Sequence, residues 1–277
     1  MNNKLLLASL LLLSFAAMAV FEAPSPDAVA MGMADITPAI GLGPTSLFSD
    51  GGITAGGAYR RSFNYADFDQ LSAWASWSKE RIGRFSAVFG TFSVPDLSTE
   101  TEVSLGYTRS IVSDIHTELN IAARGDIYSL SYGKSLGGID LGSDAGFALD
   151  LGAEAVIYKR TRVRILAENL TATNLGVEGD IEIPRAVSAS IGYSPYTATD
   201  MVFHIRRETG VDYSYGLGIS ASPHKMITFR FGAATNPDRV TGGIGLKYKF
   251  VRFDYSLKSH PALPLTHAVS MGIDLER

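Results

Sequence analysis

The stretch that decides the fold runs from Gly243 to Leu275 and reads GIGLKYKFVRFDYSLKSHPALPLTHAVSMGIDL. Apolar residues occupy every second position in 243–248, 251–258 and 269–275, and mostly glycine, serine or charged residues lie between them. A period of two residues is typical of a β-strand whose two faces meet different surroundings. The phase of the alternation changes between the first two segments, which predicts a tight hairpin turn at Lys249-Phe250.

The same alternation recurs upstream of this stretch, in segments of strand length. Clear examples are 147–157 and 227–233, and turn-forming residues such as Asn236-Pro237-Asp238 separate the segments. The stretch from Tyr128 to Ser135 is either a further strand or the closing half of the hairpin before it. Helical periodicity is essentially absent. The sequence therefore predicts an all-β protein of about fourteen antiparallel strands, or about twelve at the least, over residues 51–277.

Residues 1–19 have the three parts of a secretory signal peptide. Lys4 gives a positive start, residues 5–15 form an apolar core, and Ala17-Met18-Ala19 is a small-x-small cleavage site. The apolar run is shorter than the ~20 residues that a membrane-spanning helix needs, which disfavours the alternative of an uncleaved anchor. The sequence therefore predicts an exported protein.

The segment 20–50 is rich in proline and glycine and has no clear period, so we do not expect it to be a strand. It is either a loose tail or a compact plug for the domain that follows. Its apolar side chains at Met31, Met33, Leu42 and Phe48 could line a small ligand pocket. They could equally seal a plug against a surrounding wall, and the sequence leaves both alternatives open.

Composition excludes several classes of protein. The chain has 277 residues, a formal charge of −4 and no cysteine. The charge is too small and of the wrong sign for a protein that binds nucleic acid. Without cysteine the chain has no disulfides and no thiolate metal sites, so its stability depends on the fold alone.

Alternation by itself does not say which face points inward. A soluble β-sandwich that binds carbohydrate or protein would bury the apolar face, whereas a membrane barrel turns this face toward lipid. The polar faces are rich in glycine and serine, which suit a crowded lumen, and tyrosine and phenylalanine recur at segment ends, where interfacial girdles place them. These features favour a transmembrane antiparallel β-barrel in the outer membrane of a Gram-negative type envelope, surrounded by outer-membrane lipid.

Three motifs resemble those of FadL-like outer-membrane barrels, and most closely those of the PorV/PorQ branch. The stretch 243–275 resembles the family's closing hairpin, its His-Pro-x-Leu loop and the Thr-His that precedes its last strand, at Gly245, Leu246, Tyr248, Asp254, Tyr255, His260, Pro261, Leu263, Thr266 and His267. Residues 147–152 resemble the family's central strand, and residues 30–34 resemble a motif of its N-terminal hatch. The resemblance implies a barrel plugged by its N-terminus. It also implies import of hydrophobic small molecules, or an accessory role in protein export to the cell surface by type IX secretion.

Charged residues of both signs interrupt the polar faces. If these faces line a lumen, the candidates for a lumen charge network are Asp150, Glu154, Arg162, Arg164, Arg206, Arg230, Arg252 and Asp254. Such charges either pair across strands and stiffen the wall, or form a polar path with a selective field. We favour pairing, because a lining of mixed sign is poorly suited to select one ion.

The sequence contains no catalytic motif. The five histidines are not spaced as metal ligands, and no nucleophile elbow, zinc motif, phosphate loop or dinucleotide fingerprint occurs. We therefore expect no catalytic residues, no metal and no cofactor, and hence no enzyme. The leading hypothesis is a transporter of hydrophobic small molecules, or an export accessory that contacts envelope or secretion proteins. The alternatives are a structural envelope protein without transport and a secreted soluble β-sandwich.

Overall fold

The computed structural model describes residues 27–36, 51–64, 68–79, 81–134, 141–176 and 181–276. The predicted signal peptide, Leu42 and Phe48 lie outside these ranges. Within them, no helix has both the length and the apolar character that crossing a membrane requires.

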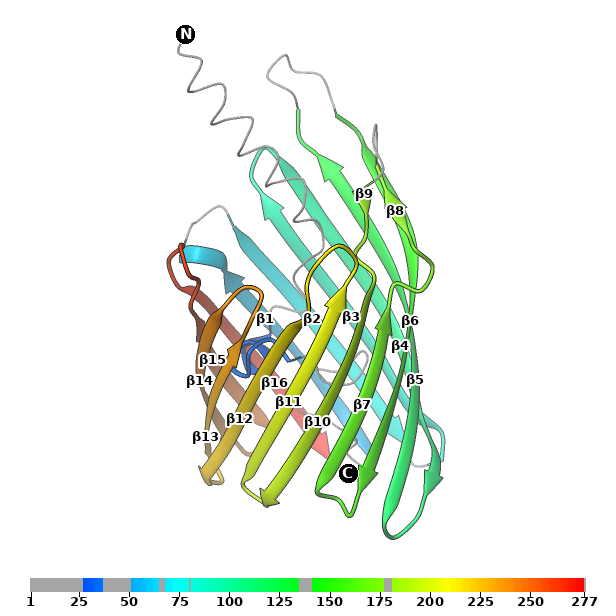
Figure 1. Cartoon of the computed structure of the whole chain (residues 1–277), viewed down its shortest axis with the longest axis vertical. Coiled ribbons are helices and arrows are strands. Elements are labelled where there is room, and N and C mark those ends of the chain that lie inside the picture. Colours follow the sequence, from blue (N-terminus) through cyan, green and yellow to red (C-terminus); the bar gives the residue numbers. More distant parts are fainter. Residues whose placement is uncertain are drawn as a thin grey trace.

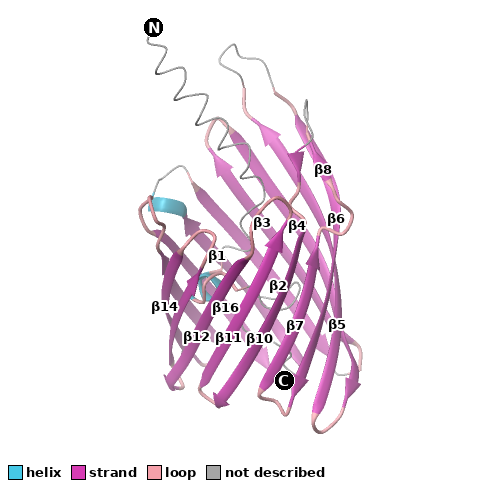
Figure 2. Ribbon diagram, in the orientation of Figure 1, coloured by secondary structure: helices cyan, strands magenta, loops and turns pink. Residues whose placement is uncertain are grey.

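Fourteen of the described strands form one closed antiparallel barrel, as predicted (Figure 1), and strands make up nearly all of the structure (Figure 2). In chain order the barrel strands are β1 (Gly51–Arg61), β2 (Asp69–Lys79), β3 (Gly83–Val94), β4 (Ser98–Ser113), β5 (Thr117–Tyr132), β6 (Ser143–Ile157), β7 (Thr161–Glu168), β10 (Ala186–Tyr196), β11 (Thr199–Glu208), β12 (Ser214–His224), β13 (Ile227–Ala234), β14 (Arg239–Tyr248), β15 (Val251–Lys258) and β16 (Thr266–Glu276). Two short strands, β8 (Asn174–Leu175) and β9 (Ile181–Glu182), pair with each other. Among the described residues, the helical elements are α2 (Ala28–Gly32) and the 3-10 turn η1 (Ser62–Asn64).

The stretch 243–275 closes the barrel. Tyr248 pairs with Val251, so Lys249-Phe250 is the predicted two-residue turn. Lys249 has a φ of 53°, and hairpins with two-residue turns require a positive φ at a turn position. The last segment belongs to β16, which pairs with β15 on one side and with β1 on the other. The first and last strands of the barrel therefore meet along one seam.

The two faces of the wall are inverted relative to a soluble protein. Large apolar side chains on outward positions are exposed, for example Phe231 at 61% and Leu105 at 66%. Polar side chains on inward positions are buried, for example Asp126 and Ser256 at 0%. A soluble β-sandwich would bury the large apolar side chains in its core. The observed burial is the reverse, so the prediction of a membrane barrel is the correct one of the two alternatives. The outward face is an apolar surface suited to lipid.

The barrel has two different ends. At the end where β1 begins and β16 finishes, turns of two or three residues join neighbouring strands. At the other end, the connections range from three residues between β3 and β4 to seventeen residues between β7 and β10. We call these the turn end and the loop end.

The wall is taller on the side of β4 to β6 (Figure 1). These strands have 16, 16 and 15 residues, whereas β7, β13 and β15 have eight each. The stretch that begins at Tyr128 is therefore neither a separate strand nor half of a hairpin, but the loop-end part of β5. On its inward face, Tyr128 and Leu130 form an apolar cluster with Ala148 of β6 and with Leu175 and Ile183. The loop end thus carries an apolar cluster on the tall side.

A charge at mid-height of the outward face is expected to destabilise the barrel. Phe231 lies in the middle of β13, between Ile219 and Gly242, and an arginine there would face the lipid interior at a cost of about 2–4 kcal/mol. Phe250, exposed at the turn end, is the matched control, since the same change near the interface costs about 0–1 kcal/mol. Urea titrations of both variants in phospholipid vesicles measure the difference. Equal midpoints for Phe231→Arg and Phe250→Arg would contradict a lipid-facing β13.

Candidate functional site

A short segment of the chain lies inside the barrel, against the inward face of β13 to β16 (Figure 1). It comprises residues 27–36 and is called here the inner segment. Asp27 caps its helix α2, since the carboxylate accepts a hydrogen bond from the Val29 amide at 2.9 Å. The Ser270 hydroxyl of β16 donates to the same carboxylate at 3.2 Å. The start of the segment is thus fixed both to its own helix and to the wall.

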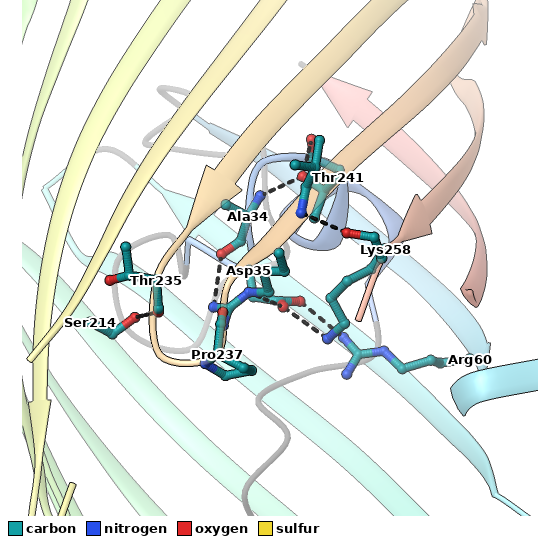
Figure 3. Close-up of polar contacts among 12 residues, drawn as sticks. Ala34, Asp35, Arg60, Ser214, Thr235, Pro237, Thr241 and Lys258 are labelled. Atoms are coloured by element: carbon teal, nitrogen blue, oxygen red, sulfur yellow. Dashed lines mark hydrogen bonds and ion pairs between the residues drawn. The ribbon is translucent and has the colours of Figure 1, made fainter. Parts of the chain in front are cut away.

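Hydroxyl groups of two further strands hold the backbone of the inner segment. In β14, the Thr241 hydroxyl donates to the Gly32 carbonyl at 3.1 Å and accepts from the Ala34 amide at 3.0 Å (Figure 3). In β15, the Ser256 hydroxyl donates to the Ala28 carbonyl. These hydroxyls are buried and replace the water that the backbone groups lose when the segment enters the barrel.

Glycines in the wall make room for the inner segment. A Cβ atom on Gly232 of β13 would lie 2.5 Å from the Ala34 amide nitrogen, and one on Gly218 of β12 would lie 3.0 Å from the Met33 Cβ. Larger residues at these positions would collide with the segment, because a packed interior has no spare volume. Ala34 and Ile36 are buried against the wall as a result. The sequence shows these glycines only as a feature of the polar faces, without revealing the segment that they accommodate.

The four residues predicted to line a pocket divide between described and undescribed parts of the chain. Met31 is fully buried beside Ala268 of β16. Met33 is half-buried against β12. Leu42 and Phe48 lie outside the described residues, and the two methionines on the inner segment contact different strands of the wall.

Three cations surround Asp35 near the end of the inner segment. The Asp35 carboxylate lies 2.9 Å from the Lys258 ammonium, and 3.5 Å from each of the Arg239 and Arg60 guanidinium groups (Figure 3). The cations belong to β15, β14 and β1 and lie where these strands reach the loop end. Sequence reasoning missed this group, because 223 residues separate Asp35 from Lys258 and no local pattern connects them.

The ion pairs of Asp35 stabilise the docked inner segment, whereas the backbone conformation of Asp35 destabilises it. Burial opposes ionisation of Asp35, but the charges of Lys258, Arg60 and Arg239 outweigh it and lower the pKa of the carboxyl group to about 2. Ala34 and Asp35 have φ values of 65° and 57°, in the left-handed region that residues with a side chain avoid. Each such residue costs about 1–2 kcal/mol. The contacts with the wall therefore hold a strained backbone in place.

The Asp27 carboxyl group is the pH-sensitive part of the inner segment. Asp27 is 1% exposed, and one of its carboxylate oxygens has no hydrogen-bond partner among the described residues. Burial raises the pKa of Asp27 to about 6, and the charge of Asp254 adds to the rise. The Val29 amide, Arg252 and Ser270 act against it. Asp27 is therefore poised to change its charge in the mildly acidic range.

We expect the inner segment to be held more tightly at about pH 5 than at about pH 7.5. Docking raises the pKa of Asp27 from 3.8 to about 6, so docking takes up a proton and gains stability as the pH falls through this value. The docking equilibrium shifts about tenfold over this range, in which Asp35 stays ionised. Maleimide labelling of a Met31→Cys reporter, divided by that of an exposed Leu263→Cys control, measures docking. Asp27→Asn is expected to remove the pH dependence of docking. If labelling of this variant still depends on pH, another group is responsible.

The eight predicted lumen charges lie on inward positions, where ion pairs join them to partners in the wall. The pairs are Arg230 and Arg252 with Asp254, Arg164 with Glu154, Asp150 with Arg124, Arg206 with Glu168 and Glu208, and Arg162 with Asp200. Sequence reasoning missed Asp126, which is fully buried and lies 2.9 Å from the Arg124 guanidinium. In the described part of the chain, no three histidine or acidic side chains gather where a metal ion could bind.

Three of these pairs join strands that are not neighbours. Arg230 of β13 donates to Asp254 of β15 at 2.8 Å across Gly245 of β14. A Cβ atom on Gly245 would lie 2.9 Å from the guanidinium, so the pair requires glycine there. In the same way, Arg206 and Asp200 of β11 reach Glu168 and Arg162 of β7 across β10. These pairs fasten three strands at a time.

A closed barrel of fourteen antiparallel strands, apolar outside and charged inside, has the architecture of an outer-membrane β-barrel. No family model and no curated protein matches the chain. Among solved structures, it is similar to the CymD monoaromatic hydrocarbon channel, with 14% identity and a TM-score of 0.65 over 93% of this chain and 99% of that one. It is also similar to the toluene transporter TbuX of Ralstonia pickettii, with 12% identity and a TM-score of 0.65 over 92% and 100% of the two chains.

A third similar structure is the toluene transporter TodX of Pseudomonas putida, with 10% identity and a TM-score of 0.57 over 93% of this chain and 98% of that one. At these identities the likeness concerns the fold and not the activity. It agrees with the predicted closed β-barrel fold. The assignment to the FadL-like family and to its PorV/PorQ branch stays a prediction.

Proposed function

We propose that the chain is an outer-membrane channel for hydrophobic small molecules and that the inner segment belongs to its plug. The observation that carries the proposal is the docking of this segment on the lumen wall through hydroxyl groups, glycines and one group of ion pairs. Such contacts order a segment yet can break during a transport cycle. The similar structures bear the names of hydrocarbon channels and toluene transporters, which supports the same class of cargo.

The proposal divides the chain into three parts: a signal peptide at 1–19, a plug at 20–50 and the barrel at 51–277. The loop end faces the outside and the turn end faces the periplasm, since outer-membrane barrels have short periplasmic turns and longer external loops. A hydrophobic molecule from outside would then meet the apolar cluster around Tyr128 and Leu130. It would leave through the space that the inner segment vacates.

The lumen charges have a structural role in this proposal. Each predicted cation lies beside a carboxylate of the wall, which weakens the field that these side chains could use to select an ion. The pairs stiffen the strands while the plug moves. This role fits a cargo that is apolar rather than ionic.

An accessory role in protein export is the second function that the resemblance implies. The motif in residues 243–275 is the feature that favours it, because these residues resemble the closing hairpin and loop of the PorV/PorQ branch. Co-purification with large envelope proteins, in a chain that takes up no hydrocarbon, would support this role over transport.

A reversible cross-link between the inner segment and the wall tests the transport proposal. The Met33 Cβ and a Cβ built on Gly218 lie 3.0 Å apart, within a small backbone shift of the ~3.8 Å typical of a disulfide. The chain has no cysteine of its own, so the Met33→Cys/Gly218→Cys variant can form only this bond. Cells that produce it are expected to take up labelled toluene when the disulfide is reduced and to lose this uptake when it is oxidised.

The two single-cysteine variants are the controls, because neither can form the bond. Heat-modifiable migration on gels confirms that each variant forms a folded barrel. Uptake that is equal in both redox states would contradict a plug formed by the inner segment. A folded barrel that takes up no toluene in either state would contradict a hydrocarbon channel.

A further inference from the structure

One charged side chain lies on the outward face well inside a strand. Arg109 of β4 is exposed on an outward position, and four residues of the strand follow it before the turn end. Its outward neighbours are apolar: Tyr107 on the same strand, and Ile121 of β5, which pairs with it. Among the described residues, every other charged side chain on an outward position of the wall lies within two residues of a strand end. Arg109 is therefore the exception on a surface that is otherwise suited to lipid.

Arg109 has no carboxylate partner within the part of the chain that the structure describes. At the loop end, by contrast, the outward Arg61 pairs with Asp69 at 3.0 Å. A charge that faces lipid is destabilising unless it reaches an anion or the head-group layer. The position of Arg109 therefore indicates an anionic partner from outside the chain.

Three aromatic rings stand in one row beside Arg109. Trp77 and Phe85 stack with ring centroids 6.0 Å apart, and the centroids of Phe85 and Tyr107 are 4.9 Å apart. The Tyr107 hydroxyl donates to the Ile82 carbonyl at 2.6 Å, which fixes this ring against the turn between β2 and β3. Tryptophan and tyrosine are typical of the head-group level of a membrane. The row thus places Arg109 beside the layer in which lipid phosphates lie.

Lys79 supplies a second cation on the same face. It ends β2 and pairs with Gly83 of β3, and Arg109 lies on the far side of Gly83, because the adjacent pair is Arg84 with Thr108. Gly83 has a φ of 109°, and a Cβ atom there would lie 2.5 Å from the Thr108 carbonyl oxygen, so no side chain fills the space between the two cations. Two strand spacings, about 10 Å, separate their backbones. Both side chains are long enough to meet one phosphate group between them.

We propose that this part of the outward face binds the head group of an anionic glycerophospholipid. The residues, called here the phosphate cluster, are Lys79, Arg109, Trp77, Phe85 and Tyr107. The phosphate would lie between the two cations, with the rings beside the glycerol. Glu80 and Arg81 of the intervening turn have opposite charges, so the cluster keeps a net charge of about +2, which favours an anionic lipid over a zwitterionic one.

The proposed lipid is a resident of the wall and not a cargo. The phosphate cluster lies on the outward face, whereas the inner segment docks on the inward face of β13 to β16. In the orientation given above, the turn end faces the periplasm, so the lipid would belong to the periplasmic leaflet. An acyl chain would extend toward mid-height over Ala87 and Leu105, which form the next outward pair of β3 and β4. The lipid would therefore brace these strands where they face the bilayer.

The first test uses Trp77 as a fluorescent reporter in the full chain, in phosphatidylcholine nanodiscs. The chain has two tryptophans, and Trp74→Phe leaves only Trp77; heat-modifiable migration confirms the folded barrel. Each cation strengthens the binding of an anionic lipid about fivefold. Brominated phosphatidylglycerol is therefore expected to quench Trp77 at a mole fraction at least about tenfold lower than brominated phosphatidylcholine. Equal quenching by the two lipids overturns the inference.

Two controls show whether the cluster itself binds the lipid. Lys79→Gln/Arg109→Gln is expected to abolish the preference for phosphatidylglycerol. Lys225→Gln/Lys249→Gln removes two exposed cations from other turn-end hairpins and is expected to keep it; an equal loss would indicate a general surface charge and overturn the inference. Excess glycerophosphate, which has no acyl chains, is expected to leave the quenching unchanged. Relief of quenching would assign the cluster to a soluble phosphate and overturn the lipid.

The second test compares the stability of Arg109→Leu in two membranes. The variant removes a lipid-facing charge, so its barrel is expected to fold at least as well as the parent where no anionic lipid is present. In phosphatidylglycerol vesicles it loses the phosphate contact, and its urea midpoint is expected to fall below that of the parent. In phosphatidylcholine vesicles no such fall is expected. An equal shift of the midpoint in both membranes overturns the inference, whatever the cargo of the barrel.

Discussion

Gly232→Val is expected to expel the inner segment from the lumen while the barrel stays closed. The new Cβ would lie 2.5 Å from the Ala34 amide nitrogen and 2.8 Å from the Met33 carbonyl carbon. Both are backbone atoms, so no rotamer change relieves the collision. Overpacking of this kind typically costs about 1–3 kcal/mol, which shifts an equilibrium on the order of 10- to 100-fold. Labelling of the Met31→Cys reporter is expected to accelerate by that factor.

Gly192→Val is the matched control for this change. Gly192 also lies on an inward position, in β10, but its Cβ would meet its nearest atom at 3.6 Å, which is ordinary contact. This variant is expected to label as slowly as the parent. Both variants are expected to show the same heat-modifiable migration, because the pairing of β12, β13 and β14 does not involve the inner segment. If Gly232→Val labels no faster than Gly192→Val, the segment does not dock on β13 as described.

Asp254→Ala is expected to lower the free energy of unfolding by about 3–5 kcal/mol. The buried Asp254 carboxylate accepts hydrogen bonds from Arg230 and Arg252, each at 2.8 Å. Arg230 is itself buried. Without Asp254 its charge would stay in the wall without its carboxylate partner, and an uncompensated buried charge costs more than the pair contributes. Urea titration of the barrel in vesicles measures the loss.

A second variant separates the buried charge from the loss of packing. Arg230→Met/Asp254→Leu removes both members of the pair and is expected to recover most of the stability, because apolar replacements of buried pairs are often neutral. Asp200→Ala is the control: Asp200 lies 3.6 Å from Arg162 and its side chain is 47% exposed, so its loss is expected to cost at most about 1 kcal/mol. If Asp254→Ala and Asp200→Ala lower the free energy of unfolding equally, burial of the Arg230–Asp254 pair does not increase the cost of losing one partner.

The barrel could be predicted from the sequence because its signal is local. An alternation of two residues is visible within one strand, and the change of phase at Lys249-Phe250 marks a turn between adjacent strands. The inverted faces follow from the residue types on each side of every strand. The length of β5 was missed because Tyr128 begins an apolar stretch on what is elsewhere a polar face.

The candidate site depends on contacts that no local pattern contains. Asp35 meets its cations only after the barrel closes, and Arg230 reaches Asp254 over a strand that lies between them. Gly232 and Gly245 give the clearest case. In the sequence these glycines indicate only a polar, crowded face. Their structural role depends on the atoms that surround them in the folded barrel. Their absence of a side chain is what admits the segment and the ion pair.

The seam between β1 and β16 has a consequence for assembly in the membrane. Beside its loop end, the Phe63 amide donates to the Thr266 hydroxyl, although 203 residues separate them. Until the seam forms, both strands are open edges, and each unpaired backbone group in hydrocarbon costs several kcal/mol. A partly assembled sheet is therefore unstable in the bilayer. Insertion and closure are expected to occur in one cooperative step, which is slow because it joins such distant parts of the chain.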